Sequence, residues 1–246
     1  MEDDIQHNPI EAKRKAVHME NLPVDEKLNR LKMIYALFDS SLNAFDTACR
    51  KKCAACCTCN VATTGLEAEM IQAALSRSQR LDLLSRIVSN VPEKRYHPVL
   101  TTNCFARFVM EDRQLPHEEN DPSWGVCPIL ENHTCTIYAS RPLGCRVLMS
   151  QTPCRKNGYA QMPELALTLN TIFQQAVEHL DHGGIFGNLS DVLAAVVTGE
   201  SGAVKQKRLH GPARFLKNEK ISVLMIPPDH RRKTEALIRR LSGLLE

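Results

Sequence analysis

The chain has 246 residues, of which 43% are hydrophobic and 24% are charged, so it can bury a proper core and does not need the disulfides of a small secreted scaffold. No apolar run is long enough to cross a bilayer, and the acidic N-terminal stretch lacks the apolar core of a signal peptide. These features exclude a membrane-spanning protein and favour a cytoplasmic one, in which thiols stay reduced.

The formal net charge of +3 is distributed unevenly. Residues 205–246 carry 11 Lys or Arg and four acids, a net charge of +7, which leaves about −4 for the rest of the chain. Basic residues on a terminal helix are usually a solvated face, and aromatic residues make up only 5% of the chain, too few for a base-stacking platform. Nucleic acid is therefore not an expected partner, whereas an unidentified protein partner or substrate stays open.

The first predicted element is a helix of about six turns that leads directly to the first cysteine. Its apolar residues recur at alternating steps of four and three, a spacing that a coiled-coil seam would share: Val24, Leu28, Leu31, Tyr35, Phe38, Leu42 and Phe45. Thr64 followed by Glu67 makes a capping box that starts a second helix. A third helix is expected from about Ser78 to Val91, before Pro92.

The helical pattern breaks between residues 96 and 128, where prolines are frequent. Here the run "CFARFVM" from Cys104 to Met110 predicts a short strand, and the polar residues 111–125 predict a loop. Helices resume at about 163–180 and 189–197, and the "GGIFG" between them, residues 183–187, is interpreted as a loop.

The last 40 residues predict a hairpin and a helix. "ARFLKNEKISVLMI", residues 213–226, contains two apolar runs around Lys217 to Lys220, and a basic amphipathic helix follows residues 227–229. The expected fold class is therefore mainly α, a helical domain with a loop-rich cysteine cluster and little β structure beyond short hairpins.

Three segments are expected from this pattern. Residues 1–22 form a flexible N-terminal extension, residues 23–200 form a helical metal-binding domain that contains the cysteine cluster, and residues 201–246 form a basic C-terminal segment that packs on it.

All ten cysteines lie before residue 155, nine of them in two groups and Cys104 by itself between the groups. The first group reads C-x3-C-x2-C-C-x-C from Cys49 to Cys59, and the second reads C-x7-C-x9-C-x8-C from Cys127 to Cys154. Thiolates are soft ligands, and tight spacing lets a bent backbone aim several sulfurs at one centre, so the pattern indicates zinc or iron-sulfur chemistry. Cys104, alone in its apolar run, is more typical of a buried inert thiol.

Spacing alone does not choose the metal. Cys53, Cys56 and Cys59 form C-x2-C-x2-C as in a bacterial ferredoxin, and Pro128 follows Cys127, but that run lacks its next cysteine. Zinc ribbons need two separate C-x2-C knuckles with no cysteine in common. The chain has only one, because the cysteines of the second group are spaced too widely. Neighbours in an extended segment point in opposite directions, so Cys56 and Cys57 are expected either to serve two centres or to do different jobs.

Four thiolates around zinc or a [4Fe-4S] core leave a net charge near −2, which nearby cations must offset. Among the basic residues beside the cysteines, we expect this role first for Arg146, which directly follows Cys145, and also for Arg141. His133, inside the second group, is a candidate ligand or a turn residue, and the turn is the favoured interpretation.

At these residues the sequence resembles the YkgJ-type cysteine-cluster family, which is known for a CxxCxxCC signature and described as a zinc- or iron-chelating domain. The resemblance covers about Ala48 to Cys154 and is carried by "CRKKCAACC" followed by "TTGLEAEMI", and by "CPILENHTCTIYASRPLGCR". It implies eight metal ligands, with Cys59 left as an extra candidate and Cys104 outside the set: Cys49, Cys53, Cys56, Cys57, Cys127, Cys135, Cys145 and Cys154.

The leading hypothesis is a cytosolic metal-binding protein whose cysteines chelate an iron-sulfur cluster, of the [4Fe-4S] type, or zinc, with redox or protein-modifying activity left open. One alternative is a zinc-stapled binding module whose basic C-terminal tail engages a partner. A second, implied by the resemblance, is a protein lysine N-methylase of the flagellin-methylase type, although no G-x-G-x-x-G segment follows a strand. No separate acid, base or nucleophile constellation stands out, so whether the protein is an enzyme stays open.

Overall fold

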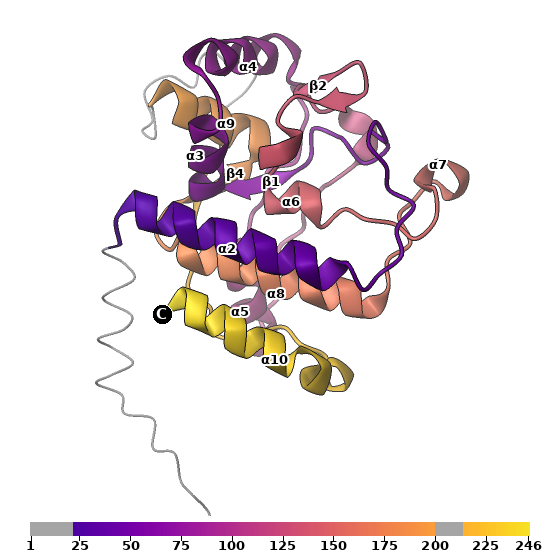
Figure 1. Ribbon diagram of the computed structural model, residues 1–246, viewed down its shortest axis with the longest axis vertical. Helices are drawn as coiled ribbons and strands as arrows, with labels where there is room; N and C mark the ends of the chain where they lie inside the picture. Colours follow the sequence, from indigo (N-terminus) through magenta and orange to yellow (C-terminus); the bar gives the residue numbers. More distant parts are fainter. Residues whose placement is uncertain (1–21, 200–213) are drawn as a thin grey trace, which may run out of the picture.

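Helices make up most of the structure, a computed structural model that describes residues 22–199 and 214–246 (Figure 1). This confirms the expected mainly α fold class. Within the described residues, no helix is long and apolar enough to cross a membrane. The helices are α2 (Val24–Leu42), α3 (Gly65–Ala73), α4 (Arg77–Asn90), α5 (Thr102–Met110), α6 (Leu143–Arg146), α7 (Cys154–Asn157), α8 (Glu164–Leu180), α9 (Leu189–Thr198) and α10 (Pro228–Leu245).

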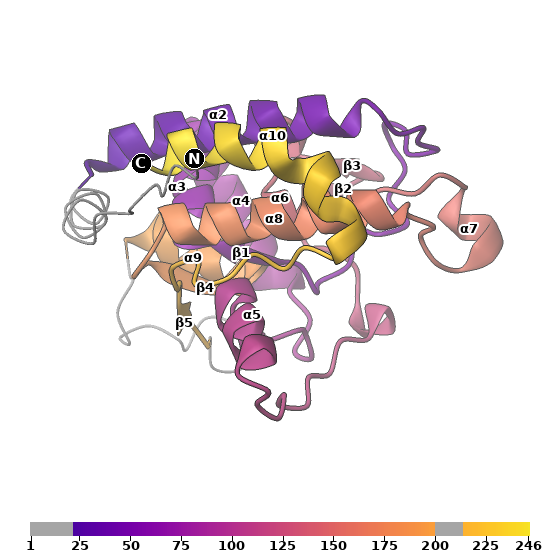
Figure 2. The same ribbon diagram turned by 90° about the horizontal axis from the view of Figure 1, so that it is seen from below.

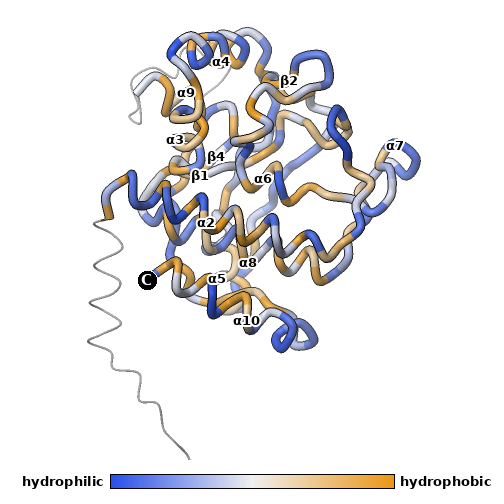
Figure 3. Tube along the Cα trace, viewed as in Figure 1, coloured by the Kyte–Doolittle hydropathy of each residue, from blue (hydrophilic) through white to orange (hydrophobic). Residues whose placement is uncertain are grey.

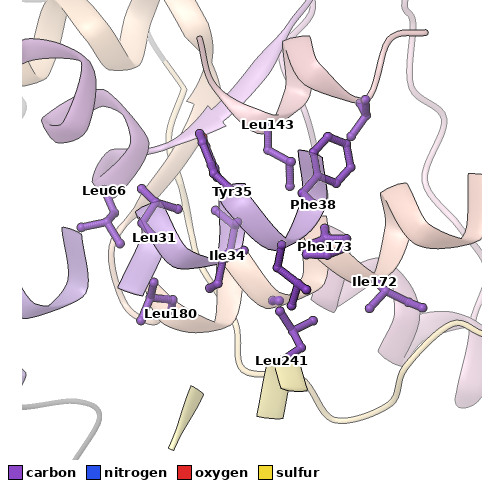
Figure 4. Packing of buried hydrophobic residues seen from close by; sticks show 14 of the residues in the cluster. Leu31, Ile34, Tyr35, Phe38, Leu66, Leu143, Ile172, Phe173, Leu180 and Leu241 are labelled. Atoms are coloured by element: carbon purple, nitrogen blue, oxygen red, sulfur yellow. The ribbon is translucent and has the colours of Figure 1, made fainter. Parts of the chain in front are cut away.

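The main hydrophobic core lies among α2, α8 and α10, which run side by side in both ribbon views (Figures 1 and 2). Its centre is an edge-to-face contact between Phe38 and Phe173, whose ring centroids are 5.1 Å apart (Figure 4). Leu31 and Ile34 of α2 and Leu241 of α10 are buried in the same cluster. The apolar stripe predicted for the first helix therefore packs onto the domain rather than forming a coiled-coil seam.

A second hydrophobic cluster lies among α3, α4 and α9 and reaches the cysteine-rich loops. Ile71, Ile87 and Val192 are fully buried there, and Cys127, Cys135 and Cys145 pack against this cluster. The hydropathy trace shows the matching asymmetry, with apolar stretches along α9 and polar residues at α7 and at the start of α10 (Figure 3). The cysteine-bearing loops are thus supported from one side by packed helices.

A small antiparallel sheet forms where the sequence predicted a loop at residues 183–187 and a hairpin within residues 213–226. Its strand order is β1 (Ala62–Thr64), β4 (Ile185–Asn188) and β5 (Leu216–Lys217), so "GGIFG" leads into a strand and is not only a loop. The hairpin predicted around Lys217 to Lys220 is wrong, because Leu216 pairs with Phe186 and residues 218–226 form no strand. Polar side chains of α8 hold that segment instead, since Gln175 accepts from the Met225 N–H and His179 accepts from the Ile221 N–H.

The strand predicted at "CFARFVM" is also wrong, because these residues belong to α5. Thr101 caps this helix by accepting a hydrogen bond from the Cys104 N–H at 3.2 Å. The Asn103 side chain secures it to the body, donating to the Gln175 carbonyl at 3.0 Å. The apolar run misled because Phe105 and Val109 face outward on the helix rather than alternating across a sheet.

The capping box predicted at Thr64 and Glu67 is confirmed and forms the start of α3. The Glu67 carboxylate is 2% exposed and also accepts hydrogen bonds from the Tyr35 hydroxyl at 2.6 Å and from the Leu143 N–H at 2.7 Å. One buried carboxylate thereby links α2, β1, α3 and α6.

The expected segment boundaries fall near parts of the chain that lie outside the described residues. Nearly all of the predicted extension, residues 1–22, lies there, as does the start of the basic segment 201–246. The described remainder of that segment includes α10, which packs against α8 and α2.

Candidate metal centre

Two chain segments far apart in sequence meet where the cysteine groups lie. Thr58 and Val126 form an antiparallel bridge. On either side of it, the Cys127 N–H donates to the Cys57 carbonyl and the Cys59 N–H donates to the Gly125 carbonyl, both at 3.0 Å. This short pairing brings the first group of cysteines against the start of the second.

The remaining cysteines are placed by short elements. Cys135 ends the hairpin of β2 (Leu130–Glu131) and β3 (Thr134–Cys135), Cys145 lies on α6, and Cys154 is the first residue of α7. The chain that enters the first group is fixed to the chain that leads to Cys154, because the Ala48 N–H donates to the Ser150 carbonyl at 2.8 Å. Both ends of the first group are therefore attached to the second.

All eight predicted ligands line one cavity with a volume of about 120 Å³. Ile129, Leu148 and Met149 contribute apolar wall to the same cavity. The members of the set differ in exposure, since Cys49 and Cys53 are exposed and the other six are partly buried. The eight are Cys49, Cys53, Cys56, Cys57, Cys127, Cys135, Cys145 and Cys154. We call this space the cysteine cavity.

Cys56 and Cys57 both line the cysteine cavity, and their thiols are hydrogen-bonded to each other, so the extended segment assumed from the sequence is not present. That the two cysteines serve two centres or do different jobs stays a prediction. The segment is turned rather than extended, with the Cys57 N–H donating to the Ala54 carbonyl at 3.1 Å. A hydrogen bond from Cys57 lowers the pKa of the Cys56 thiol to about 6, and the same bond, with burial, raises the pKa of Cys57. The adjacent thiols form a pair that carries one negative charge more readily than two.

Burial makes further negative charge costly in this cavity. It raises the pKa of Cys127 to about 11, and it also raises the pKa values of Cys145 and Cys135. Several thiolates here therefore require a positive partner, either a metal ion or basic side chains.

Basic side chains do line the cysteine cavity: Arg50, Lys51, Lys52 and Arg141. The Arg141 guanidinium lies over the Tyr138 ring, 4.2 Å from its centroid. Its Nε is buried and has no hydrogen-bond partner among the described residues. A buried donor without a partner is costly, so Arg141 brings both a positive charge and an unpaired N–H to the residues around the cavity.

Other candidates lie elsewhere. Arg146 pairs with Asp39 at 2.9 Å and does not line the cysteine cavity. Cys59 is 3% exposed and donates its S–H to Asn60, also outside that cavity, so the ferredoxin-like trio of Cys53, Cys56 and Cys59 is not brought together. Cys104 lies on α5, where burial raises its pKa to about 11.

His133 occupies the turn of the β2–β3 hairpin, as the favoured interpretation predicted. Asn132 and His133 both have positive φ, 49° and 61°, which is the pattern of a type I′ turn. The imidazole nevertheless belongs to the wall of the cysteine cavity.

The donor chemistry of the cysteine cavity fits a soft metal. Thiols are the preferred ligands of zinc and iron-sulfur clusters, and the orphaned Arg141 N–H suits their net negative charge. In residues 22–199 and 214–246, no group of three or more His, Cys, Asp or Glu side chains is arranged to hold a metal ion. Metal binding would therefore require cysteine side chains of the cavity to move closer together.

A larger cleft of about 760 Å³ adjoins the cysteine cavity, and sequence reasoning missed it. Its walls come from the segment before β1, from α5, from the loop at 115–122 and from α6. Glu118 shapes the loop wall, accepting from the Tyr96 hydroxyl at 2.8 Å and from the Val99 N–H at 2.8 Å. No motif marks such a site, because its lining residues are dispersed along the chain.

No family model, no curated protein and no solved structure matches the chain.

Proposed function

We propose that the protein binds metal through the eight thiols of the cysteine cavity, and that it does so in a reducing compartment such as the cytoplasm. The observation that carries this proposal is that all eight line a single space although they come from two distant segments. Every one of the ten cysteines is a free thiol, as ligands in such a compartment would be. The resemblance to the YkgJ-type family supports the same ligand set.

The number of thiols suits two zinc ions as well as iron-sulfur clusters, and the volume of the cavity favours a cluster as the bound group. A tetrahedral zinc site closes four sulfurs around one ion at about 2.3 Å, so it leaves no space of its own. A cavity of about 120 Å³ has room for several atoms. A cluster would supply one-electron redox chemistry, whereas zinc at the same thiols would join the two segments structurally.

Metal and acid-labile sulfide analysis, with visible absorption, tests the proposal on protein purified without oxygen from iron-replete cells. One [4Fe-4S] cluster, held by four of the eight thiols, predicts brown protein with about four irons and four sulfides per chain, and two clusters held by all eight predict about twice these amounts. Colourless protein with about two zinc ions and no sulfide would show that the bound group is structural zinc and not a cluster. In that case chelation of the zinc should unfold the protein. Protein without either metal would refute the proposal.

Matched cysteine variants locate the ligands. Cys53→Ser and Cys127→Ser each remove one thiol from a different segment, so both should lower metal content if the two segments share a centre. Cys104→Ser and Cys59→Ser remove thiols that do not line the cysteine cavity. Both variants should therefore keep the metal content of the wild type. Equal loss in all four variants would mean that metal content follows general stability instead.

A further inference from the structure

The cleft of about 760 Å³ has the size of a small-molecule site, since ligand pockets commonly measure about 300–1,000 Å³. It is lined by apolar side chains together with hydroxyl and amide groups, including Leu100, Phe105, Thr101, Thr102 and Asn120. This mixture suits an organic molecule with an apolar body and a few polar groups.

The charges around the cleft exclude an anionic occupant. Among residues 22–199 and 214–246, the lining contains two carboxylates, Glu67 and Glu118, and no Lys, Arg or His. Four basic residues line the cysteine cavity next to it, and none of them lines the cleft. An anion in the cleft would meet negative charge without a compensating cation.

The two carboxylates are already engaged by the protein. Glu67 accepts from Tyr35 and Leu143, and Glu118 accepts from Tyr96 and Val99. Neither needs a cationic ligand to satisfy its oxygens, so an uncharged occupant fits the cleft best.

The mouth of the cleft carries apolar side chains that are unusually exposed. Phe105 of α5 is 38% exposed, Leu115 of the following loop is 41% exposed, and Tyr159 is 64% exposed. Val177 and Phe186 line the same space; Val177 is buried and Phe186 is half-buried. An occupant with an aromatic or aliphatic body would cover exposed apolar surface at the mouth.

The cleft and the cysteine cavity share a wall. Cys56 and Cys154 line both spaces, together with Ala55, Leu148 and Ala160. A molecule that fills the cleft therefore lies against Cys56 and Cys154, two of the eight residues of the cysteine cavity.

We propose that this cleft binds an uncharged, partly apolar organic molecule whose inner end lies against Cys56 and Cys154. Binding in the cleft does not depend on a metal. Only the consequence, that the occupant is held beside the centre that would act on it, rests on the proposed function.

Nile red, an uncharged apolar dye, provides the first test, by fluorescence titration of the full chain as purified. We expect saturable binding that Phe105→Glu and Leu115→Glu each weaken at least tenfold. Val109→Glu is the matched control, because Val109 lies on the same helix, is 52% exposed and does not line the cleft. Absent saturation, or equal weakening by the control, would overturn the proposed site.

Charge selectivity is tested by displacing the dye with 4-phenylbutanol or with 4-phenylbutanoate, which differ in charge at one end. The alcohol should displace Nile red at a concentration at least tenfold lower than the carboxylate. Equal or tighter binding of the carboxylate would overturn the assignment to an uncharged occupant.

Ala160→Trp tests the shared wall, because it adds a bulky side chain there without removing a thiol. We expect at least a tenfold loss of Nile red affinity, whereas Ala139→Trp, at an exposed position that lines neither space, should have no effect. Unchanged affinity in Ala160→Trp would show that the occupant does not reach the thiols. Because this readout is the dye, it can succeed or fail independently of metal content.

Discussion

The Cys127 backbone N–H donates to the Cys57 carbonyl at 3.0 Å, and this bond joins the two cysteine groups. It belongs to a minimal antiparallel pairing, with Thr58 opposite Val126 and Gly125 accepting from Cys59. Because so few backbone hydrogen bonds hold this pairing, the alignment of the two cysteine groups is sensitive to the conformation of the residues that form it.

Gly125 is the position at which that alignment is most sensitive. Its φ is +156°, and a Cβ there would lie 2.5 Å from Cγ of Pro92. We expect Gly125→Ala to destabilise the fold by about 1–3 kcal/mol, in urea denaturation, and to lower the metal content of purified protein. Gly243→Ala on α10 is the control, since its Cβ meets nothing within 4 Å, and alanine there should be neutral or stabilising by up to about 1 kcal/mol. Equal metal content in the two variants would contradict this role for the pairing.

Arg141 and Arg146 have the same side chain and are five residues apart, but only Arg141 lines the cysteine cavity. Arg141→Met removes the unpaired Nε donor, so we expect metal affinity to fall about 10–100-fold in a chelator competition. Arg146→Met removes the pair with Asp39 and should leave metal affinity within about twofold of wild type. If Arg146→Met had the larger effect on affinity, the assignment of the offsetting charge to Arg141 would be wrong.

The hydroxyl of Tyr35 donates to the buried Glu67 carboxylate at 2.6 Å, and burial together with that negative charge raises the pKa of Tyr35 well above its usual value. Tyr35→Phe leaves a carboxylate oxygen with one donor fewer in a dry environment. We expect a loss of about 1–3 kcal/mol in the free energy of unfolding, measured by urea denaturation. Tyr159→Phe, at an exposed ring, should cost less than about 0.5 kcal/mol, and a similar loss in both variants would refute the explanation.

Asp181 should make stability depend on pH. Burial raises its pKa to about 7, with Glu67 adding to the increase, while the Leu66 N–H, Lys27 and Asn218 lower the pKa. A carboxyl whose pKa is higher in the folded state than in the unfolded state stabilises the fold in its protonated form. This contribution is complete below about pH 4 and is lost as the pH rises through about 7.

Asp181→Asn removes that titration. The stability of the variant relative to wild type should therefore rise between about pH 4 and pH 7, by at most about 1.4 kcal/mol per pH unit, in urea denaturation at each pH. Asp82→Asn, at an exposed pair on α4, controls for the loss of a carboxylate. A difference between Asp181→Asn and wild type that does not change with pH would contradict the raised pKa.

Helices could be predicted where the sequence contains an apolar stripe with helical spacing or a capping box that marks a helix start. The stripe from Val24 gave α2, and the box at Thr64 and Glu67 gave α3. The apolar run at Cys104–Met110 was misassigned because its apolar residues face outward on α5, so burial periodicity was misleading there. The strand at Ile185–Asn188 was missed because it is fixed by pairing with distant residues.

The candidate site was predictable to a similar degree. Thiol spacing and resemblance brought together the eight cysteines that line one cavity. They favoured Arg146, although only Arg141 lines the cavity, because the pairing of Arg146 with Asp39 on a distant helix cannot be inferred from the sequence. The cleft could not be predicted for a similar reason, because residues far apart in sequence, such as Phe105 and Cys154, line it only in the folded chain.

Because two distant segments line the cysteine cavity together, the order in which they are synthesised also matters. Synthesis proceeds from the N-terminus, so Cys49 to Cys57 leave the ribosome well before Cys127 to Cys154. During that interval the early thiols have none of their later neighbours and are open to oxidation or to premature capture of a stray ion. If the eight thiols bind metal as proposed, nascent chains would need a reducing environment and a controlled metal supply until Cys154 has emerged.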